Sequence, residues 1–242
     1  MGQQIEIAVD DGSTMSAYCT RPDGPTADTV GVIVAHELFG VSPDIRAVAD
    51  EIAAAGHVVI APEFYHRDAE PGRYLARDDA GRDEGFALLH SMTRAGAVAD
   101  VRAAIAVLAE RYGAEEAAAV GFSAGGHLAY LAATALPITR VAIAYGGWLP
   151  STEIPLSRPD PTLALTPGIR GELIFLVGGD DFLIDSDQVE KIADALRAAD
   201  VRHEVVTYPG VGHAFFWPGT PAFDQDARDD AMKRILALLA AS

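Results

Sequence analysis

The sequence Val-Gly-Phe-Ser-Ala-Gly-Gly at residues 120–126 decides the fold prediction, because it joins an apolar strand to a helix through a very tight turn. Apolar residues 117–120 precede the turn, and a helix-like segment at residues 127–133 follows it. Gly121 and Gly125 flank Ser123 at positions where a Cβ would strike the neighbouring strand or helix. We therefore expect Ser123 to occupy a strained turn that lifts its hydroxyl clear of a sheet, at the positive end of a helix.

The rest of the chain alternates between strand and helix patterns around this turn. Uninterrupted apolar runs predict strands buried on both faces at residues 30–35, 58–61, 141–145 and 173–177, and a last strand is predicted at residues 204–208. Helices are predicted after Ser42, over about 95–112, from Ser186 and over 227–240, and an antiparallel hairpin is predicted at the amino end. The sequence thus predicts one α/β domain over residues 1–242, with a mostly parallel sheet of about eight strands and helices on both faces.

Three stretches carry no regular pattern and are predicted to be loops. Residues 22–28 connect two predicted strands, and residues 150–167 are rich in proline. Residues 63–81 contain many charges together with Pro71 and Gly72, and they are a plausible cap over a pocket.

Composition excludes several classes of partner. The chain has 242 residues, half of them apolar, and a net charge of −17, which argues against binding to nucleic acid or to an anionic membrane. Because it shows no secretory signal and no membrane-spanning run, we expect a cytoplasmic protein. A single cysteine, Cys19, excludes an internal disulfide and a cysteine-based metal cage, and it is predicted to be a core or edge residue.

Three polar residues follow predicted strands in the order Ser123, Asp181, His213. In open parallel sheets, ligands bind beyond the carboxyl ends of the strands, so these side chains are expected to converge there. The order is that of the α/β-hydrolases. Asp180 is the competitor for the acidic position, and the spacing Gly-x-x-Asp-x-x-Ile favours Asp181.

This set of residues suits nucleophilic catalysis. A serine hydroxyl becomes nucleophilic when an imidazole accepts its proton, and a carboxylate then fixes the imidazole tautomer and stabilises its charge. The alternatives are that the carboxylates only cap a turn and that His213 is an ordinary loop histidine. We expect the histidines at positions 57, 90, 127 and 203 to be structural, and no spacing of residues supports a zinc site.

The sequence resembles the dienelactone hydrolase family of α/β-hydrolases over nearly its whole length. The resemblance rests on His-Glu-Leu-Phe-Gly at residues 36–40, Gly-Phe-Ser-Ala-Gly-Gly at 121–126 and Gly-His-Ala-Phe at 212–215. It implies hydrolysis of small esters or lactones through a covalent acyl intermediate without a cofactor. It also implies an oxyanion hole formed by the backbone N–H groups of Leu38 and Ala124, which the turn geometry predicts as well.

Two departures from the family pattern concern the chemistry and the substrate. The best-known members have a cysteine where this chain has Ser123. In those members, the glutamate that matches Glu37 helps to generate the thiolate. With a serine, Glu37 either forms a structural ion pair, or orients other residues or contacts the substrate. Members that bind a dienelactone carboxylate hold it with two arginines. Arg82 matches one of these positions, or is simply a solvated helix charge, and Trp217 replaces the other. A neutral or bulkier ester or lactone is therefore expected.

Two functions are compatible with the sequence. The first is a serine hydrolase of small carboxylic esters or lactones. The second is a non-catalytic protein that binds a ligand in the same pocket, for which loss of the three polar residues would be the usual mark. Since all three residues are present, hydrolysis is the favoured prediction, and the sequence predicts neither the natural substrate nor the oligomeric state.

Overall fold

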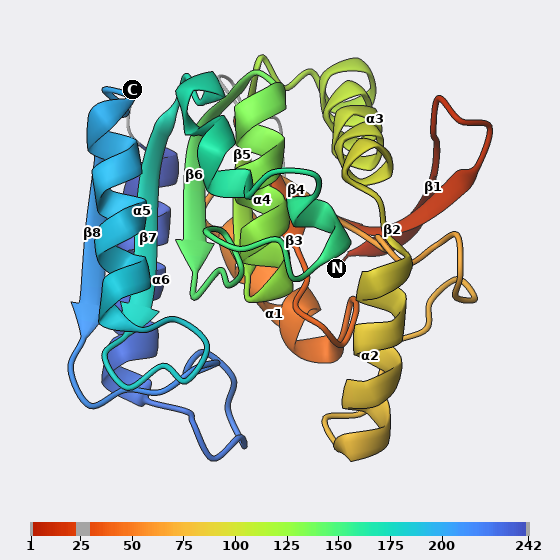
Figure 1. Cartoon of the computed structure of the whole chain (residues 1–242). Coiled ribbons are helices and arrows are strands. Elements are labelled where there is room, and N and C mark those ends of the chain that lie inside the picture. Colours follow the sequence, from red (N-terminus) through yellow and green to blue (C-terminus); the bar gives the residue numbers. More distant parts are fainter. Residues whose placement is uncertain (1, 23–29, 241–242) are drawn as a thin grey trace.

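The centre of the protein is one eight-stranded sheet, seen in a computed structural model that describes residues 2–22 and 30–240 (Figure 1). The strands are β1 (Gln3–Ala8), β2 (Thr14–Thr20), β3 (Val30–Ala35), β4 (Val58–Pro62), β5 (Glu116–Phe122), β6 (Ile138–Ala144), β7 (Glu172–Gly178) and β8 (His203–Tyr208). Their order is β1-β2-β4-β3-β5-β6-β7-β8, with antiparallel pairing of β1 with β2 and of β2 with β4, and parallel pairing elsewhere. The predicted fold class is confirmed. Of the loop predicted at residues 22–28, only residue 22 belongs to the described part of the chain.

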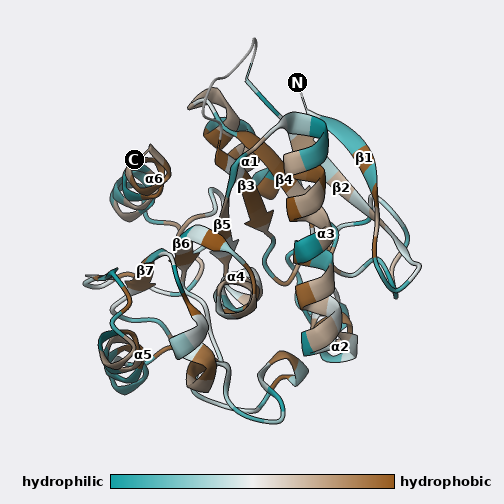
Figure 2. Ribbon diagram, turned by 90° about the horizontal axis from the view of Figure 1, so that it is seen from above, coloured by the Kyte–Doolittle hydropathy of each residue, from teal (hydrophilic) through white to brown (hydrophobic). Residues whose placement is uncertain are grey.

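Helices cover both faces of this sheet. Helices α1 (Pro43–Ala54) and α6 (Gln225–Ala240) lie on one face, and α3 (Arg94–Tyr112), α4 (Ala124–Ala135) and α5 (Ser186–Ala198) lie on the other (Figures 1 and 2). Helix α2 (Asp79–Ser91) lies near the edge where the parallel strands end. Two 3₁₀ helices, η1 (Pro155–Ser157) and η2 (Thr162–Gly168), interrupt the predicted proline-rich loop.

Side-chain caps begin several of these helices where the sequence contains suitable residues. Ser42 accepts a hydrogen bond from the backbone N–H of Ile45, and Pro43 occupies the first turn of α1. Asp185 caps α5 by accepting from the N–H of Gln188. The start predicted at Ser186 is therefore correct, with the aspartate before it as the cap.

The spacing of apolar residues in α3 predicts that Val98, Val101, Ile105 and Leu108 face the core, and Val101 and Leu108 are buried as predicted. Val98 and Ile105 are half-buried, and the alanines Ala97 and Ala104 are among the residues that face the core. Small side chains allow a helix to approach the sheet closely, and hydrophobicity alone does not reveal that preference. Cys19 is buried, as predicted, and its thiol donates to the Tyr112 hydroxyl.

The innermost strands carry the core and end at one edge. Every residue of β3 and β4 is buried, and the central strands are coloured as hydrophobic in Figure 2. Their carboxyl ends meet at the lower edge of the sheet in Figure 1.

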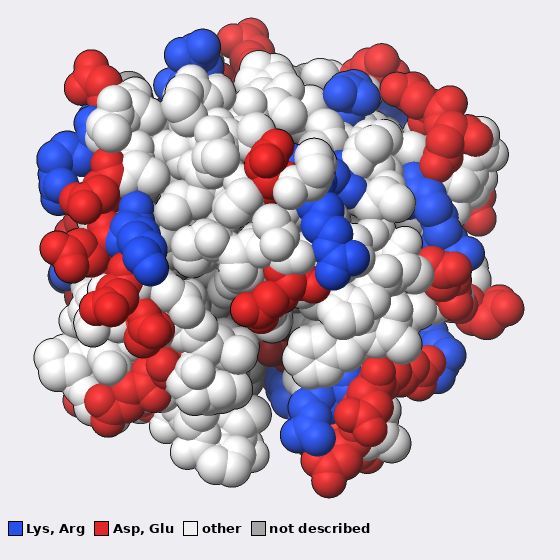
Figure 3. All heavy atoms as spheres, viewed as in Figure 1, with Lys and Arg blue, Asp and Glu red and all other residues white. Residues whose placement is uncertain are grey.

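On the face shown in Figure 3, basic side chains stand singly or beside acidic ones, so that face has no continuous basic area. Within the described residues, no helix has both the length and the apolar character needed to cross a bilayer.

Candidate functional site

Ser123 occupies the tight turn between β5 and α4. Its φ and ψ angles are 51° and −115°, a conformation that side chains rarely adopt. A Cβ at Gly121 would lie 2.2 Å from the carbonyl oxygen of Gly125, and a Cβ at Gly125 would lie 2.2 Å from that of Ala35. The two glycines are therefore required for the reason that the sequence suggested, because backbone atoms of neighbouring segments occupy the space that a Cβ would need.

The three polar residues predicted from the sequence form one hydrogen-bonded chain. Ser123 Oγ lies 3.0 Å from His213 Nε2, and His213 Nδ1 lies 2.8 Å from Asp181 Oδ2. All three residues are buried, with 7 to 9% of each exposed. If Nδ1–H donates to the carboxylate, Nε2 is left free to accept the serine proton, which is the arrangement that nucleophilic activation requires. The competing residue, Asp180, is exposed and takes no part in this chain.

Backbone hydrogen bonds fix the carboxylate of Asp181. Its Oδ1 accepts from the N–H groups of Leu183 at 2.8 Å and Ile184 at 3.2 Å, while Oδ2 faces His213. Both oxygens thus have defined partners, so the carboxylate cannot rotate away without losing hydrogen bonds. The turn after β7 therefore sets the position of the imidazole.

Two backbone donors that follow the ends of the neighbouring strands β3 and β5 have no acceptor among the described residues. They are the N–H groups of Leu38, in the turn after β3, and of Ala124, at the start of α4. The turn that carries Leu38 is held by the Tyr65 hydroxyl, which donates to the Leu38 carbonyl at 3.1 Å. Free N–H groups held by the fold are the kind of donor from which an oxyanion hole is built.

Glu37 forms an ion pair with an arginine that the sequence did not single out. Arg77 donates to Glu37 Oε1 from Nη2 at 2.6 Å and from Nε at 2.9 Å, and it also binds Asp44. Its guanidinium carbon lies 5.2 Å from the centre of the Trp217 ring. Burial raises the pKa of Glu37, although Arg77 opposes this rise. Arg77 lies in the aperiodic stretch 63–81, where no motif or spacing could have indicated it.

Arg82 is the predicted substrate-binding arginine, and it lies on the outer side of α2. Its side chain is 55% exposed and is close to Asp79 and Asp83 of the same helix, at 3.4 and 3.9 Å. This placement favours the alternative of a solvated helix charge.

Two aromatic rings that the sequence analysis did not predict lie against the imidazole of His213. The Tyr145 ring is 5.0 Å away and fully buried, and the Phe182 ring is 5.4 Å away and 81% exposed. Tyr145 has a positive φ of 44°, and its hydroxyl is buried without a hydrogen-bond partner among the described residues. The imidazole therefore meets one ring on its buried side and one on its solvent side.

Two other buried histidines have structural partners. His127 Nδ1 lies 2.8 Å from the Gly147 carbonyl oxygen, and its Nε2 lies 2.9 Å from the Thr162 hydroxyl. Because the carbonyl can only accept, Nδ1 carries a proton, and burial lowers the pKa of His127 to about 4, which favours the neutral ring. His36 contacts the Glu37 carbonyl and the Phe64 N–H in the same way, and burial lowers its pKa to about 4 as well.

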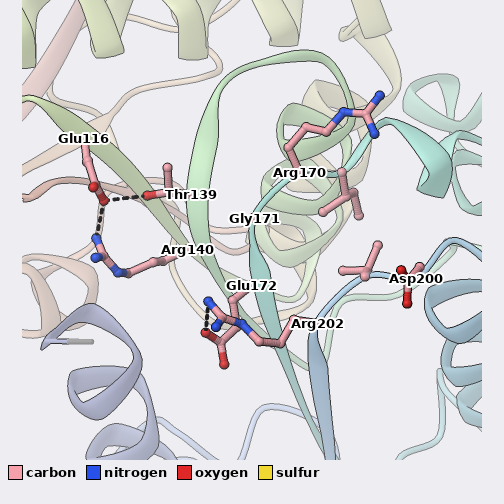
Figure 4. Close-up of a pocket in the computed structure, with 10 residues that line it drawn as sticks. Glu116, Thr139, Arg140, Arg170, Gly171, Glu172, Asp200 and Arg202 are labelled. Atoms are coloured by element: carbon pink, nitrogen blue, oxygen red, sulfur yellow. Dashed lines mark hydrogen bonds and ion pairs between the residues drawn. The ribbon is translucent and has the colours of Figure 1, made fainter. Parts of the chain in front are cut away.

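A separate cavity of about 410 Å³ lies where β5, β6 and β7 begin, at the other edge of the sheet (Figure 4). Arg140 pairs with Glu116 at 2.6 Å, and Arg202 pairs with Glu172 at 2.8 Å. The residues that line this cavity include neither a histidine nor a cysteine. This cavity is therefore not part of the site around Ser123.

Comparisons with known proteins agree with the resemblance seen in the sequence. Residues 15–242 match the model of the dienelactone hydrolase family. A protein of Synechocystis sp. is 32% identical over 213 residues, which cover 86% of this chain and 84% of the relative. One of Salmonella typhimurium is 31% identical over 227 residues, which cover 93% and 82%. Both bear the name "Putative carboxymethylenebutenolidase". A crystal structure from Klebsiella pneumoniae, titled as that of a "Putative Dienelactone Hydrolase", has a TM-score of 0.88 and 28% identity, and the match covers 100% of this chain and 99% of that one.

Proposed function

The chain belongs to the dienelactone hydrolase family, and from this premise we propose that it hydrolyses small carboxylic esters or lactones with Ser123 as the nucleophile. The observation that carries the proposal is the hydrogen-bonded chain from Ser123 Oγ through His213 to Asp181, with distances of 3.0 and 2.8 Å. These are distances at which a proton can pass from the hydroxyl to the imidazole.

The reaction proceeds in two halves. His213 Nε2 takes the proton of Ser123, and Oγ attacks the carbonyl carbon. The oxygen that becomes negative is stabilised by the N–H groups of Leu38 and Ala124, which donate to no other described residue. The ester C–O bond then breaks, and His213 returns the proton to the leaving oxygen. Water, activated by the same imidazole, releases the acid from Ser123.

Asp181 makes this proton transfer possible by holding His213 in one tautomer. Its Oδ2 accepts from Nδ1, and its negative charge stabilises the imidazolium that forms after the proton leaves Ser123. Glu37 has no part in these steps. A carboxylate is too weak a base to ionise a serine hydroxyl, and Glu37 is already paired with Arg77. Its role is to hold the turn that carries Leu38.

The charges around the site favour a neutral substrate. Arg77, the guanidinium paired with the buried Glu37, is already bound by two carboxylates and packed against Trp217. A substrate carboxylate would have to displace one of these partners. We therefore expect a higher kcat/KM for neutral esters or lactones than for a carboxylated dienelactone, and faster turnover of the dienelactone by the purified enzyme would contradict this expectation.

The proposal is tested by labelling and mutation of Ser123. A fluorophosphonate probe should label the wild-type protein at Ser123 and leave Ser123→Ala unlabelled. The variant should lose a factor of about 10³ or more in kcat on a panel of simple esters, because the remaining groups supply only weak catalysis. Circular dichroism of the variant checks that it is folded. An unlabelled wild-type protein, or a folded variant with full activity, would show that the pocket only binds ligands or that another residue is the nucleophile.

A further inference from the structure

Phe182 is an apolar side chain in an unusual position. Among the described residues, the only exposed large hydrophobic side chains are Tyr74, at 49%, and Phe182, at 81%. A single exposed apolar residue needs no explanation by itself. Phe182 is different because it directly follows Asp181 and its ring contacts His213.

The position of Phe182 is fixed by its neighbours. The N–H groups of Leu183 and Ile184 donate to Asp181 Oδ1, so the turn that carries Phe182 is built around the same carboxylate that holds His213. The Phe182 ring meets the imidazole edge to face, at 5.4 Å between centres and 66° between planes. The aromatic ring therefore stands on the solvent side of the imidazole.

The reaction geometry shows which part of a substrate would reach this ring. The carbonyl oxygen must point to the N–H groups of Leu38 and Ala124, because the negative charge develops there. The leaving oxygen must face His213 Nε2, because that nitrogen supplies its proton. The organic group attached to the leaving oxygen therefore starts beside the imidazole, and a bulky group that extends from there toward solvent can reach the exposed Phe182 ring that contacts the imidazole.

We propose that Phe182 forms an apolar subsite for the alcohol side of the substrate and that the protein prefers esters of aryl-containing or other bulky apolar alcohols. In a lactone, the same subsite would contact the ring carbons next to the ring oxygen. This inference rests on the proposed function, and it adds which half of the substrate is selected. An apolar alcohol group would cover a ring that is otherwise exposed to water, and the removal of apolar surface from water is favourable.

The inference is tested with two acetate esters that share an acyl group and differ in the alcohol. For Phe182→Ala, the kcat/KM for benzyl acetate should fall by about tenfold, mainly through a higher KM. The fall should be at least about fivefold larger than the fall for ethyl acetate, because a contact worth about 1.4 kcal/mol changes an affinity tenfold. Phe182→Leu should recover part of the loss, since it restores an apolar surface. Asp180→Ala is the matched control, because Asp180 is an exposed residue of the same turn whose side chain takes no part in the hydrogen-bonded chain, and it should keep wild-type kinetics on both esters.

The outcomes separate this inference from the proposed function. An equal fall for both esters, with a changed pH profile of kcat, would show that Phe182 only shields the imidazole, and the inference would be wrong. Unchanged kinetics on both esters would overturn it too. In either case, fluorophosphonate labelling of Ser123 in Phe182→Ala would leave the proposed function standing. Failure of the wild-type protein to label would instead remove the proposed function and the inference together.

Discussion

Asp181 holds His213 by a hydrogen bond of 2.8 Å between Oδ2 and Nδ1, and its other oxygen is bound by backbone N–H groups. The carboxylate of Asp181 is therefore held by backbone groups of its own turn, and its orientation toward His213 does not depend on solvent. Asp180, one position earlier, is exposed. This difference between two adjacent aspartates can be tested directly.

Replacing Asp181 with Asn should lower kcat by about 10³ to 10⁴. An amide N–H facing Nδ1 would favour the other tautomer, in which Nε2 carries the proton and cannot accept one from Ser123. Asp180→Asn should stay within about twofold of the wild-type kcat, since its side chain is outside the hydrogen-bonded chain. Ester hydrolysis at saturating substrate measures both effects, and similar losses in the two variants would contradict the assignment of Asp181.

Replacing Arg77 with Met should lower the free energy of unfolding by about 2 to 3 kcal/mol. The change leaves the buried carboxylate of Glu37 without its guanidinium partner, and an unpaired buried charge is costly. The double variant Arg77→Met with Glu37→Gln should recover most of this loss, because no buried charge remains. Urea unfolding of the single and double variants measures the effect.

The matched control is Arg82→Met, which removes an exposed arginine from the neighbouring helix. Its free energy of unfolding should stay within about 0.5 kcal/mol of wild type. If the double variant were as unstable as Arg77→Met, the lost stability would not come from the unpaired carboxylate of Glu37.

Replacing Gly125 with Ala should disrupt the turn at Ser123. The added Cβ would lie 2.2 Å from the Ala35 carbonyl oxygen and 2.4 Å from that of His36, and neither backbone atom can move without displacing β3 or the turn after it. We expect a loss of stability of about 2 kcal/mol or more and a loss of activity. Gly147→Ala is the control, because nothing lies within 4 Å of its Cβ position. Thermal unfolding and ester hydrolysis measure the difference between the two variants. Equal stability and activity in both would show that the turn accepts a Cβ at position 125.

The buried His127 should make stability depend on pH between about 6.5 and 4. Its folded pKa of about 4 lies below the ordinary value of 6.5, so its stabilising contribution is complete above pH 6.5 and is lost as the pH falls toward 4. The loss follows because protonation would place a positive charge in a fully buried site. It amounts to roughly 3 kcal/mol for a shift of this size.

The corresponding measurement is urea unfolding of wild type and His127→Gln at pH 7, 6 and 5. Glutamine can form hydrogen bonds but does not titrate in this range, so the variant should lose less stability between pH 7 and 5 than wild type does. Parallel pH dependence in the two proteins would show that His127 titrates alike in the folded and unfolded states.

The parts of the fold that the sequence predicts are those set by local pattern. The apolar run of β3, the glycines around Ser123 and the cap at Ser42 each act within a few residues, so their effect is visible in sequence. The same is true of the order Ser123, Asp181, His213, because parallel strands bring their carboxyl ends together whatever the distance along the chain.

The parts that could not be predicted depend on tertiary packing. Arg77 lies in a stretch without periodicity, and its partners Glu37 and Asp44 come from other segments. Phe182 is recognisable as a neighbour of Asp181, but its contact with the imidazole exists only once the loop after β8 has docked. In α3, apolar Val98 is less buried than Ala97, since close packing against the sheet selects for size as well as hydrophobicity.

The serine and the imidazole are separated by 90 positions along the chain, with His213 supplied by the loop after the outermost parallel strand. A polypeptide still emerging from the ribosome can therefore complete the turn at Ser123 while the proton acceptor has yet to be synthesised. On the proposed mechanism, the growing chain would hydrolyse no ester before β8 and the loop that carries His213 are in place, so turnover would report that folding is finished.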